Sequence, residues 1–150
     1  MDFELNGKPA RVAERPGLTL LQALRNDLAI NSPKFGCGRA LCGSCTVLVD
    51  GEPVRSCVEP AASASGRKVT TVEGLLRDGK PGPLQQAFID EQAAQCGYCT
   101  AGILMSAHAL LQRQRNPSEA EIRAGLDGNL CRCGTQNRVV RAIQRAAREA

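Results

Sequence analysis

Eight cysteines constrain this 150-residue chain more than any other feature, because they occur in clusters rather than spread along the sequence. The N-terminus, Met-Asp-Phe-Glu, has neither a basic region nor an apolar signal core, so we expect a cytoplasmic chain with reduced thiols. Clustered thiols in that compartment favour metal ligation over disulfides. The cysteines form two sets: Cys37, Cys42, Cys45 and Cys57, then Cys96, Cys99, Cys131 and Cys133.

The first set has the spacing of a plant-type [2Fe–2S] site, with three cysteines in one loop and the fourth, Cys57, after eleven intervening residues. Gly36, Gly38 and Gly43 allow backbone turns that bring amides close to the cluster sulfurs. Two alternatives remain open on spacing alone: a four-cysteine zinc site and free or catalytic thiols. Zinc sites more often show a close cysteine pair in each half, whereas Cys57 is alone.

The second set consists of two close pairs separated by 31 residues, Cys96-x2-Cys99 and Cys131-x-Cys133. Each pair precedes a predicted helix, whose N-terminal amides and dipole stabilise a negatively charged thiolate cluster. This pattern favours a second iron–sulfur cluster. A zinc site is a stronger alternative here than in the first set. A thioredoxin-like redox pair is a third alternative, but it would need a βαβ setting that this half lacks.

The first half of the chain is β-rich. The Asn6-Gly7 and Asp50-Gly51 dipeptides each predict a hairpin between alternating segments, and the second hairpin would return Cys57 to the cysteine loop. A capping box at Thr19 opens a helix that extends to Leu28, and residues 69–72 form a further strand. Together these elements predict a small mixed sheet over one helix.

The second half is helical. Residues 77–82 contain two glycines and a proline, are followed by Pro83, and form a linker. We therefore predict an α+β chain with a first domain over 1–76 and an all-α domain over 83–150. The helices of the second domain are expected over 83–89, 100–114, 118–125 and 136–148.

Charge and composition exclude other classes of partner. The net charge is +4, but only 3% of the residues are aromatic, so the stacking side chains of a nucleic-acid site are missing. No apolar run approaches the roughly 20 residues of a membrane span, so we expect no membrane insertion. Export with a signal-bearing partner stays open.

Three motifs carry a resemblance to a known family over nearly the whole chain. They span residues 36–47, 95–99 and 128–135 and contain the cysteines in the same order. With them, the chain resembles the small iron–sulfur subunit of molybdenum hydroxylases, the xanthine oxidase family. Residues 54–57 and 70–75, together with Gln85-Gln86-Ala87-Phe88, make it especially similar to the small subunits of isoquinoline oxidoreductase and of nicotinate dehydrogenases.

The resemblance implies a β-grasp, plant-type ferredoxin-like domain followed by a four-helix [2Fe–2S]-binding domain. It also implies a separate large subunit that binds a molybdopterin cofactor, of the cytosine dinucleotide form, with Gln95 and Cys133 contacting the pterin. Electrons would pass through the second cluster and then the first to an external flavin subunit, cytochrome or quinone. This chain would have no catalytic residue, and the holoenzyme would oxidise an N-heteroaromatic compound or an aldehyde.

The competing hypothesis is a free-standing ferredoxin-type electron carrier. A carrier needs one exposed cluster and no helical domain around another, so the second domain argues against it.

Some residues depart from the family pattern or call for no special role. Ala40, Ala101 and Gln136 stand where many members have Gly, Pro, and Tyr or His, respectively, which leaves the substrate subgroup open. His108, the single histidine, is expected to pack or face a partner, and Tyr98 is expected to pack over the second cluster.

Overall fold

The computed structural model of the protein describes residues 1–149. Its sheet is built around the two predicted hairpins, and both are confirmed as antiparallel pairs. The strand order is β2-β1-β5-β3-β4, in which β1 and β5 are parallel and every other neighbouring pair is antiparallel. The strands are β1 (Asp2–Leu5), β2 (Lys8–Arg11), β3 (Thr46–Val49), β4 (Glu52–Arg55) and β5 (Lys68–Thr70).

One short helix covers a face of this sheet. The capping box of Thr19 and Gln22 is present and opens α1 (Leu20–Gln22), which continues as a π-helical turn, η1 (Ala23–Asp27). Its apolar side chains are buried against the sheet, as the predicted face requires. The core of this half consists of Phe3, Val12, Leu20, Ala23, Leu24, Val47, Val49, Ala61, Ala64 and Val69.

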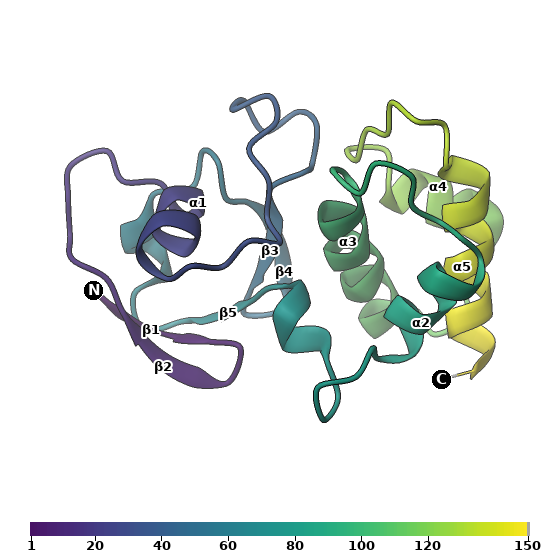
Figure 1. Cartoon of the computed structure of the whole chain (residues 1–150), viewed down its shortest axis with the longest axis horizontal. Coiled ribbons are helices and arrows are strands. Elements are labelled where there is room, and N and C mark those ends of the chain that lie inside the picture. The colour runs from purple at the N-terminus through teal and green to yellow at the C-terminus, as the bar shows by residue number, and fades with distance from the viewer. Residues whose placement is uncertain (150) are drawn as a thin grey trace.

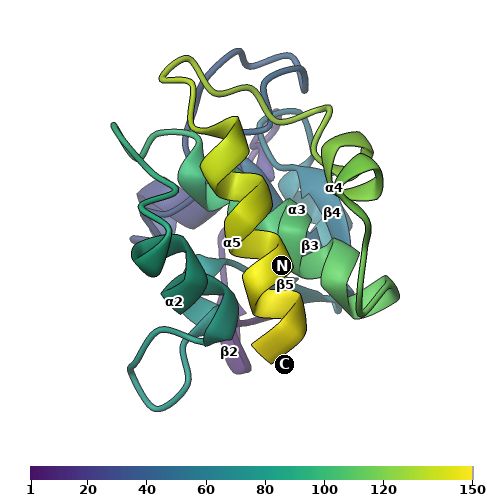
Figure 2. The same cartoon turned by 90° about the vertical axis from the view of Figure 1, so that its right-hand side faces the viewer.

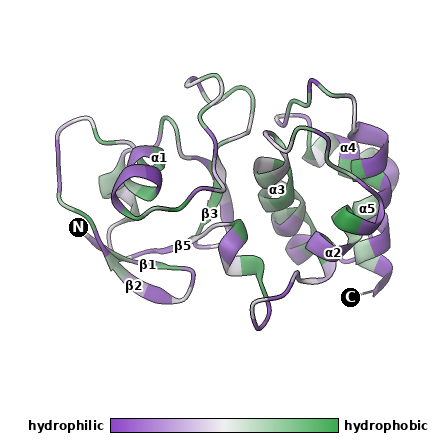
Figure 3. Ribbon diagram, viewed as in Figure 1, coloured by the Kyte–Doolittle hydropathy of each residue, from purple (hydrophilic) through white to green (hydrophobic). Residues whose placement is uncertain are grey.

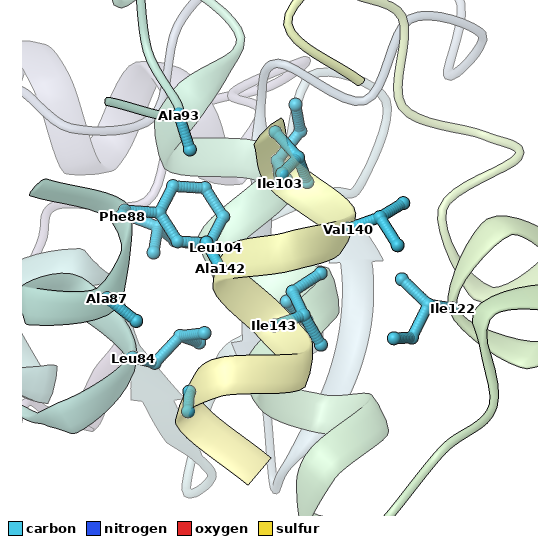
Figure 4. Close-up of a cluster of buried hydrophobic side chains, with 13 residues drawn as sticks. Leu84, Ala87, Phe88, Ala93, Ile103, Leu104, Ile122, Val140, Ala142 and Ile143 are labelled. Atoms are coloured by element: carbon cyan, nitrogen blue, oxygen red, sulfur yellow. The ribbon is translucent and has the colours of Figure 1, made fainter. Parts of the chain in front are cut away.

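Four helices form the second half, as predicted (Figures 1 and 2). Figure 3 shows hydrophobic and hydrophilic stretches alternating along the last of them, α5. Figure 4 shows Val140 and Ile143 of that helix among side chains from the other three. The helices are α2 (Pro83–Asp90), α3 (Thr100–Arg113), α4 (Glu119–Gly125) and α5 (Gln136–Glu149).

Strand β3 joins the two halves because both of its faces are buried. Val47 and Val49 face the core under α1, whereas Leu48 packs against Met105 of α3. Alternate residues of a strand point to opposite faces, so α3 covers the second face of the sheet. In Figure 1, α3 accordingly stands beside β3 at the centre of the molecule.

The structure differs from the sequence predictions at three places in the first half. The strand expected over 69–72 covers Lys68–Thr70, and Val72 instead begins a 3₁₀ turn, η3 (Val72–Leu75). A second 3₁₀ turn, η2 (Ala61–Ala64), was not expected. The return strand ends at Arg55, so Cys57 lies in the turn that follows. No helix within residues 1–149 is long and apolar enough to cross a membrane.

Candidate iron–sulfur sites

The loop over residues 36–45 wraps its backbone around one sulfur atom. The backbone N–H groups of Arg39, Leu41 and Cys42 donate hydrogen bonds to Cys37 Sγ at 3.4, 3.2 and 3.4 Å. The Arg39 amide, with those of Cys42 and Leu41, lowers the pKa of the Cys37 thiol to about 6. The loop therefore favours the thiolate, which is the form that binds metals.

Two glycines of this loop lie where a side chain would be crowded. A Cβ atom on Gly36 would lie 2.7 Å from Cys42 Sγ. Gly38 has a φ of +64°, and a Cβ there would lie 2.8 Å from the Phe35 ring. Both positions exclude a side chain, which is what the sequence predicted for the glycines of this loop.

Cys45 and Cys57 form the buried end of the first set. They pack with Leu21 in a small apolar cluster, so the two thiols are neighbours. Burial raises the pKa of Cys45 to about 11. The hydroxyl of Ser56 donates to the Cys45 carbonyl at 2.6 Å, which holds the two segments together.

The second set is also arranged in pairs. The Cys96 thiol lies next to that of Cys133, and the Cys99 thiol lies next to that of Cys131. Burial raises the pKa of Cys99 to about 12. Partial burial also raises the pKa of Cys131, but hydrogen bonds from the Thr135 hydroxyl, 3.2 Å away, and from its backbone outweigh that effect and bring it to about 7.

Two helix N-termini present these thiols. Cys99 is the N-cap residue of α3, and Thr135 immediately precedes α5. The first amides of each helix have no partner within the helix and favour negative charge nearby. Both helices thus begin where the cysteine motifs predicted.

All eight thiols are free, and each has another cysteine of its set as a neighbour. Within residues 1–149, no three His, Cys, Asp or Glu side chains converge on a point that would hold a single metal ion. The thiols instead come as two pairs per set, which places two donors at each side of a set.

A hydrogen bond joins the two sets directly. The backbone N–H of Leu130 donates to the carbonyl of Cys42 at 2.9 Å. Leu130 is covalently bonded to Cys131. The connection therefore runs from Cys42 of the first set, through this hydrogen bond and Leu130, to Cys131 of the second set. Gly102 of α3 packs so close that a Cβ there would overlap the carbonyl oxygen of Gly43.

Arg55 and Asn129 hold the same junction. The guanidinium of Arg55 donates to the carbonyl of Gly128 at 2.9 Å and to the hydroxyl of Thr46. Asn129 donates through Nδ2 to the carbonyl of Gly43 at 3.4 Å, while its Oδ1 is buried without a hydrogen-bond partner among the described residues.

Comparisons with known proteins agree with this arrangement. Residues 3–72 match the 2Fe-2S iron-sulfur cluster binding domain, and residues 71–144 match the [2Fe-2S] binding domain. A nicotinate dehydrogenase subunit from Pseudomonas putida is 54% identical over 147 residues, covering 98% of this chain and 94% of its own. The alpha subunit of isoquinoline 1-oxidoreductase from Brevundimonas diminuta is 50% identical, covering 100% and 99%. The crystal structure of quinoline 2-oxidoreductase from Pseudomonas putida 86 contains a chain that superposes with a TM-score of 0.91 at 40% identity, covering 100% of this chain and 96% of that one.

The chain belongs to the family of small iron–sulfur subunits of molybdenum hydroxylases. It is thus an electron-transfer subunit of an oxidoreductase, with a ferredoxin-like domain and a helical [2Fe–2S]-binding domain, and the family implies a larger catalytic partner.

Five of the seven exposed large hydrophobic side chains of this small subunit's described residues lie within two positions of a cysteine. Four of them form an apolar rim around both sets, consisting of Phe35, Leu41, Tyr98 and Leu130, and the fifth is Val58, which follows Cys57. The Tyr98 hydroxyl donates to the Phe35 carbonyl, so the rim also connects the two sets. Exposed apolar side chains gathered in this way are typical of a protein–protein contact.

The remaining predicted residues are placed as follows. Gln95 is exposed beside Cys96, and Cys133 is partly exposed. His108 is half-buried on α3 and lines a cleft between the two halves, together with Arg77. Because burial and the charge of Arg77 both oppose protonation, the pKa of His108 lies below its usual value.

Sequence reasoning missed three residues that organise this small subunit's sites: Arg55, Asn129 and Thr135. Thr135 follows Cys131 by four residues at the start of a helix, and that spacing could have identified it as a hydroxyl donor. Arg55 and Asn129 act across 73 and 86 residues of sequence, and no local pattern indicates such contacts.

Proposed function

We propose that this small subunit binds one [2Fe–2S] cluster with each cysteine set and passes electrons from a molybdopterin-bearing large subunit, through the second set and then the first, to an external acceptor. The observation that carries the proposal is the hydrogen bond from the Leu130 amide to the Cys42 carbonyl. It links the two sets by a few bonds inside one folded chain. An electron carrier with a single exposed cluster would have no second set of cysteines for this hydrogen bond to connect.

The donor chemistry fits a pair of clusters. Four thiolates ligate a [2Fe–2S] cluster, two on each iron. Cys37 with Cys42, and Cys45 with Cys57, supply two such pairs in the first set. The second set supplies Cys96 with Cys133 and Cys99 with Cys131.

When bound, each cluster would take up one electron and later release it. While the electron is held, the cluster carries one additional negative charge. The surrounding amides stabilise that charge. Arg39, Leu41 and Cys42 already aim their N–H groups at Cys37 Sγ, and hydrogen bonds to cluster sulfurs raise a reduction potential. The first set is therefore suited to hold the added electron.

The pterin contact falls on the exposed side of the second set. Gln95 is exposed and can offer its amide to a pterin ring, while Cys133 is partly exposed and its neighbour Cys96 is exposed. We propose that both residues contact the molybdopterin cofactor, in its cytosine dinucleotide form, held by the large subunit. Tyr98 and Leu130 of the apolar rim would bury against that subunit.

The acceptor would approach the other side of the rim, at Phe35 and Leu41 next to the first set. We propose a cytochrome, a quinone or a flavin subunit in this role. The similar proteins named above act on nicotinate, isoquinoline and quinoline, which supports an N-heteroaromatic substrate for the holoenzyme, with an aldehyde as second choice. The substrate itself would bind to the large subunit.

Residues 1–76, 77–82 and 83–150 are proposed as cluster domain, linker and second cluster domain. Two separate hydrophobic cores, one on each side of residues 77–82, support this division within the described chain. A cytoplasmic location is proposed on the reduced state that eight thiolate ligands require.

The test measures iron, acid-labile sulfide and zinc in the chain purified with its large partner, with low-temperature EPR after reduction by dithionite. We expect about four iron and four sulfide per chain, with two distinguishable rhombic signals. Two iron and one zinc would contradict the second cluster and with it the proposed electron route. A stable monomer purified without any molybdenum-containing subunit would instead support the free-standing carrier.

A further inference from the structure

A large cleft lies between the two halves of the described chain, and no cysteine lines it. Its volume is about 970 Å³, and it is bordered by η3, the linker, α2, α3 and the end of α5. In Figure 1 the linker loop lies at the bottom of the molecule, whereas the cysteine loops lie at the top. A ligand in this cleft would therefore sit apart from both proposed clusters.

The charges around the cleft are all of one sign. Arg77, Arg115 and Arg148 line it together with His108, and no Asp or Glu is among its lining residues. All three arginines are exposed, and none of them forms an ion pair or a side-chain hydrogen bond with another residue of the range 1–149. Seven other arginines of the described chain do pair with carboxylates. His108 lies in the same cleft, where burial and then the positive charge of Arg77 lower its pKa.

The rest of the lining indicates what kind of anion fits. Leucine side chains, including the exposed Leu76, give apolar wall between the arginines. Gln112 and Asn116 are exposed and form no side-chain hydrogen bond within residues 1–149, so their amides are available to the N–H and C=O groups of a peptide backbone. No Phe, Tyr or Trp lines the cleft for stacking a nucleotide base. The volume is at the upper end of the range for ligand pockets, so a single phosphate would leave most of it empty.

We propose that this cleft docks an extended segment of the catalytic partner subunit that carries alternating acidic and aliphatic side chains. The proposal rests on the proposed function for the identity of the partner, and on charge complementarity for the chemistry of the segment. Carboxylates pair with the three arginines, and the aliphatic side chains pack on the leucines. The partner would thus hold two ends of this small subunit, the apolar rim at the cysteines and the cleft opposite.

The first test uses the cluster-loaded chain and a synthetic probe, a short end-capped peptide of alternating glutamate and leucine. We expect binding that weakens with added salt and that raises the pKa of His108, followed through the NMR signals of this single histidine. Each of R77Q, R115Q and R148Q should weaken binding by about twofold to fivefold, and the triple variant by on the order of thirtyfold. R67Q is the control for net charge: it removes one positive charge outside the cleft, at an arginine that is paired with Asp50, and should leave the affinity unchanged.

Three results would overturn the proposal. A peptide with glutamine in place of glutamate could bind equally well, which would exclude charge recognition. Inorganic phosphate or ATP could bind as tightly and displace the probe, which would make the cleft a small-anion site. R67Q could weaken the probe as much as the cleft variants, which would reduce the effect to net charge.

The second test uses the complex with the large subunit. Native mass spectrometry should show the triple variant dissociating at lower salt than the R67Q complex does. Both complexes should keep the same iron content and dithionite-reduced EPR signals, because the arginines touch no cysteine. Equal salt resistance would refute docking in the cleft, whereas missing EPR signals in the unaltered complex would refute the cluster assignment and leave the cleft result standing.

Discussion

The two cysteine sets of this small subunit are built in opposite ways. Three members of the first set lie in one loop over residues 37–45, and amides of that same loop hold the sulfur of Cys37. The second set comes from two segments separated by 31 residues, and they meet only because helices α2 to α5 pack around a common core.

The two arrangements of cysteines therefore have different causes: local backbone conformation for the first set and tertiary packing for the second. The first set depends on backbone conformation, on the absence of side chains at Gly36 and Gly38, and on a short hairpin that returns Cys57. The second depends on tertiary packing and on two helix N-termini. A local motif can be recognised and disturbed locally, whereas the second set should respond to any change that loosens the helical core.

The largest expected effect separates the sets by their place in the electron route. In the complex with its large subunit, Cys133→Ser should abolish substrate-driven reduction of both clusters, because it removes the ligand proposed to contact the pterin. Cys42→Ser should block exit to the acceptor and leave reduction of the second cluster intact. Stopped-flow absorbance with rapid-freeze EPR would follow each cluster after substrate is added.

The control for both variants is reduction by dithionite, which needs no substrate. It should still reduce the unaltered cluster in each case. Equal loss of every substrate-driven step in both variants would contradict an ordered route through the second set and then the first.

The next effect concerns stability. Ile143 and Leu24 are both fully buried, one in the helical core and one in the core under α1. Ile143→Ala should lower the free energy of unfolding of the helical half by about 2–5 kcal/mol, since it removes buried methylenes and leaves a cavity. During urea unfolding, we expect the EPR signal of the second cluster to disappear first while that of the first persists.

Leu24→Ala is the matched variant in the other half. It should leave the second signal unchanged up to the urea concentration at which the parent chain loses it. If both variants lost both signals at one urea concentration, the two halves would unfold as a unit. The different construction of the two sets would then have no effect on the order in which they unfold.

Much of the fold could be predicted because its signals are local. The turns at Asn6-Gly7 and Asp50-Gly51 and the capping box at Thr19 are confirmed, and the helix predicted over 118–125 begins with a capping box at Ser118. Each of these depends on residues within a few positions of one another. Pro83 likewise begins α2, as its fixed φ favours.

What could not be predicted depends on contacts between distant segments. The close approach of Gly102 to Gly43 and the clamp of Arg55 on Gly128 exist only once β3 and α3 have packed together. The ligand assignments stay predictions, although the cysteines do meet in the expected sets. The cleft arginines belong to three separate segments, so the sequence presented them as unrelated surface charges.

The smallest expected effect concerns a residue that the sequence marked only as unusual. Ala40 stands where many family members are expected to have glycine, and its φ of +60° lies in the left-handed region that disfavours side chains. Ala40→Gly should therefore raise the free energy of unfolding by about 1 kcal/mol, measured by urea unfolding of the cluster-loaded chain. Ala29 has a φ of +56° outside the cysteine loop, so Ala29→Gly should give a similar gain.

The pair of alanine variants sharpens the comparison between the sets. Ala40 lies between Arg39 and Leu41, whose amides donate to Cys37 Sγ. Ala29, in contrast, lies outside the sequence segments that contain the cysteines. If the loop backbone alone fixes the first set, relaxing Ala40 should preserve both amide contacts and leave the reduction potential of the first cluster unchanged. A shift in that potential with Ala40→Gly, but not with Ala29→Gly, would show instead that strain at Ala40 holds the amides on the sulfur, and that this chain uses alanine to tune the site.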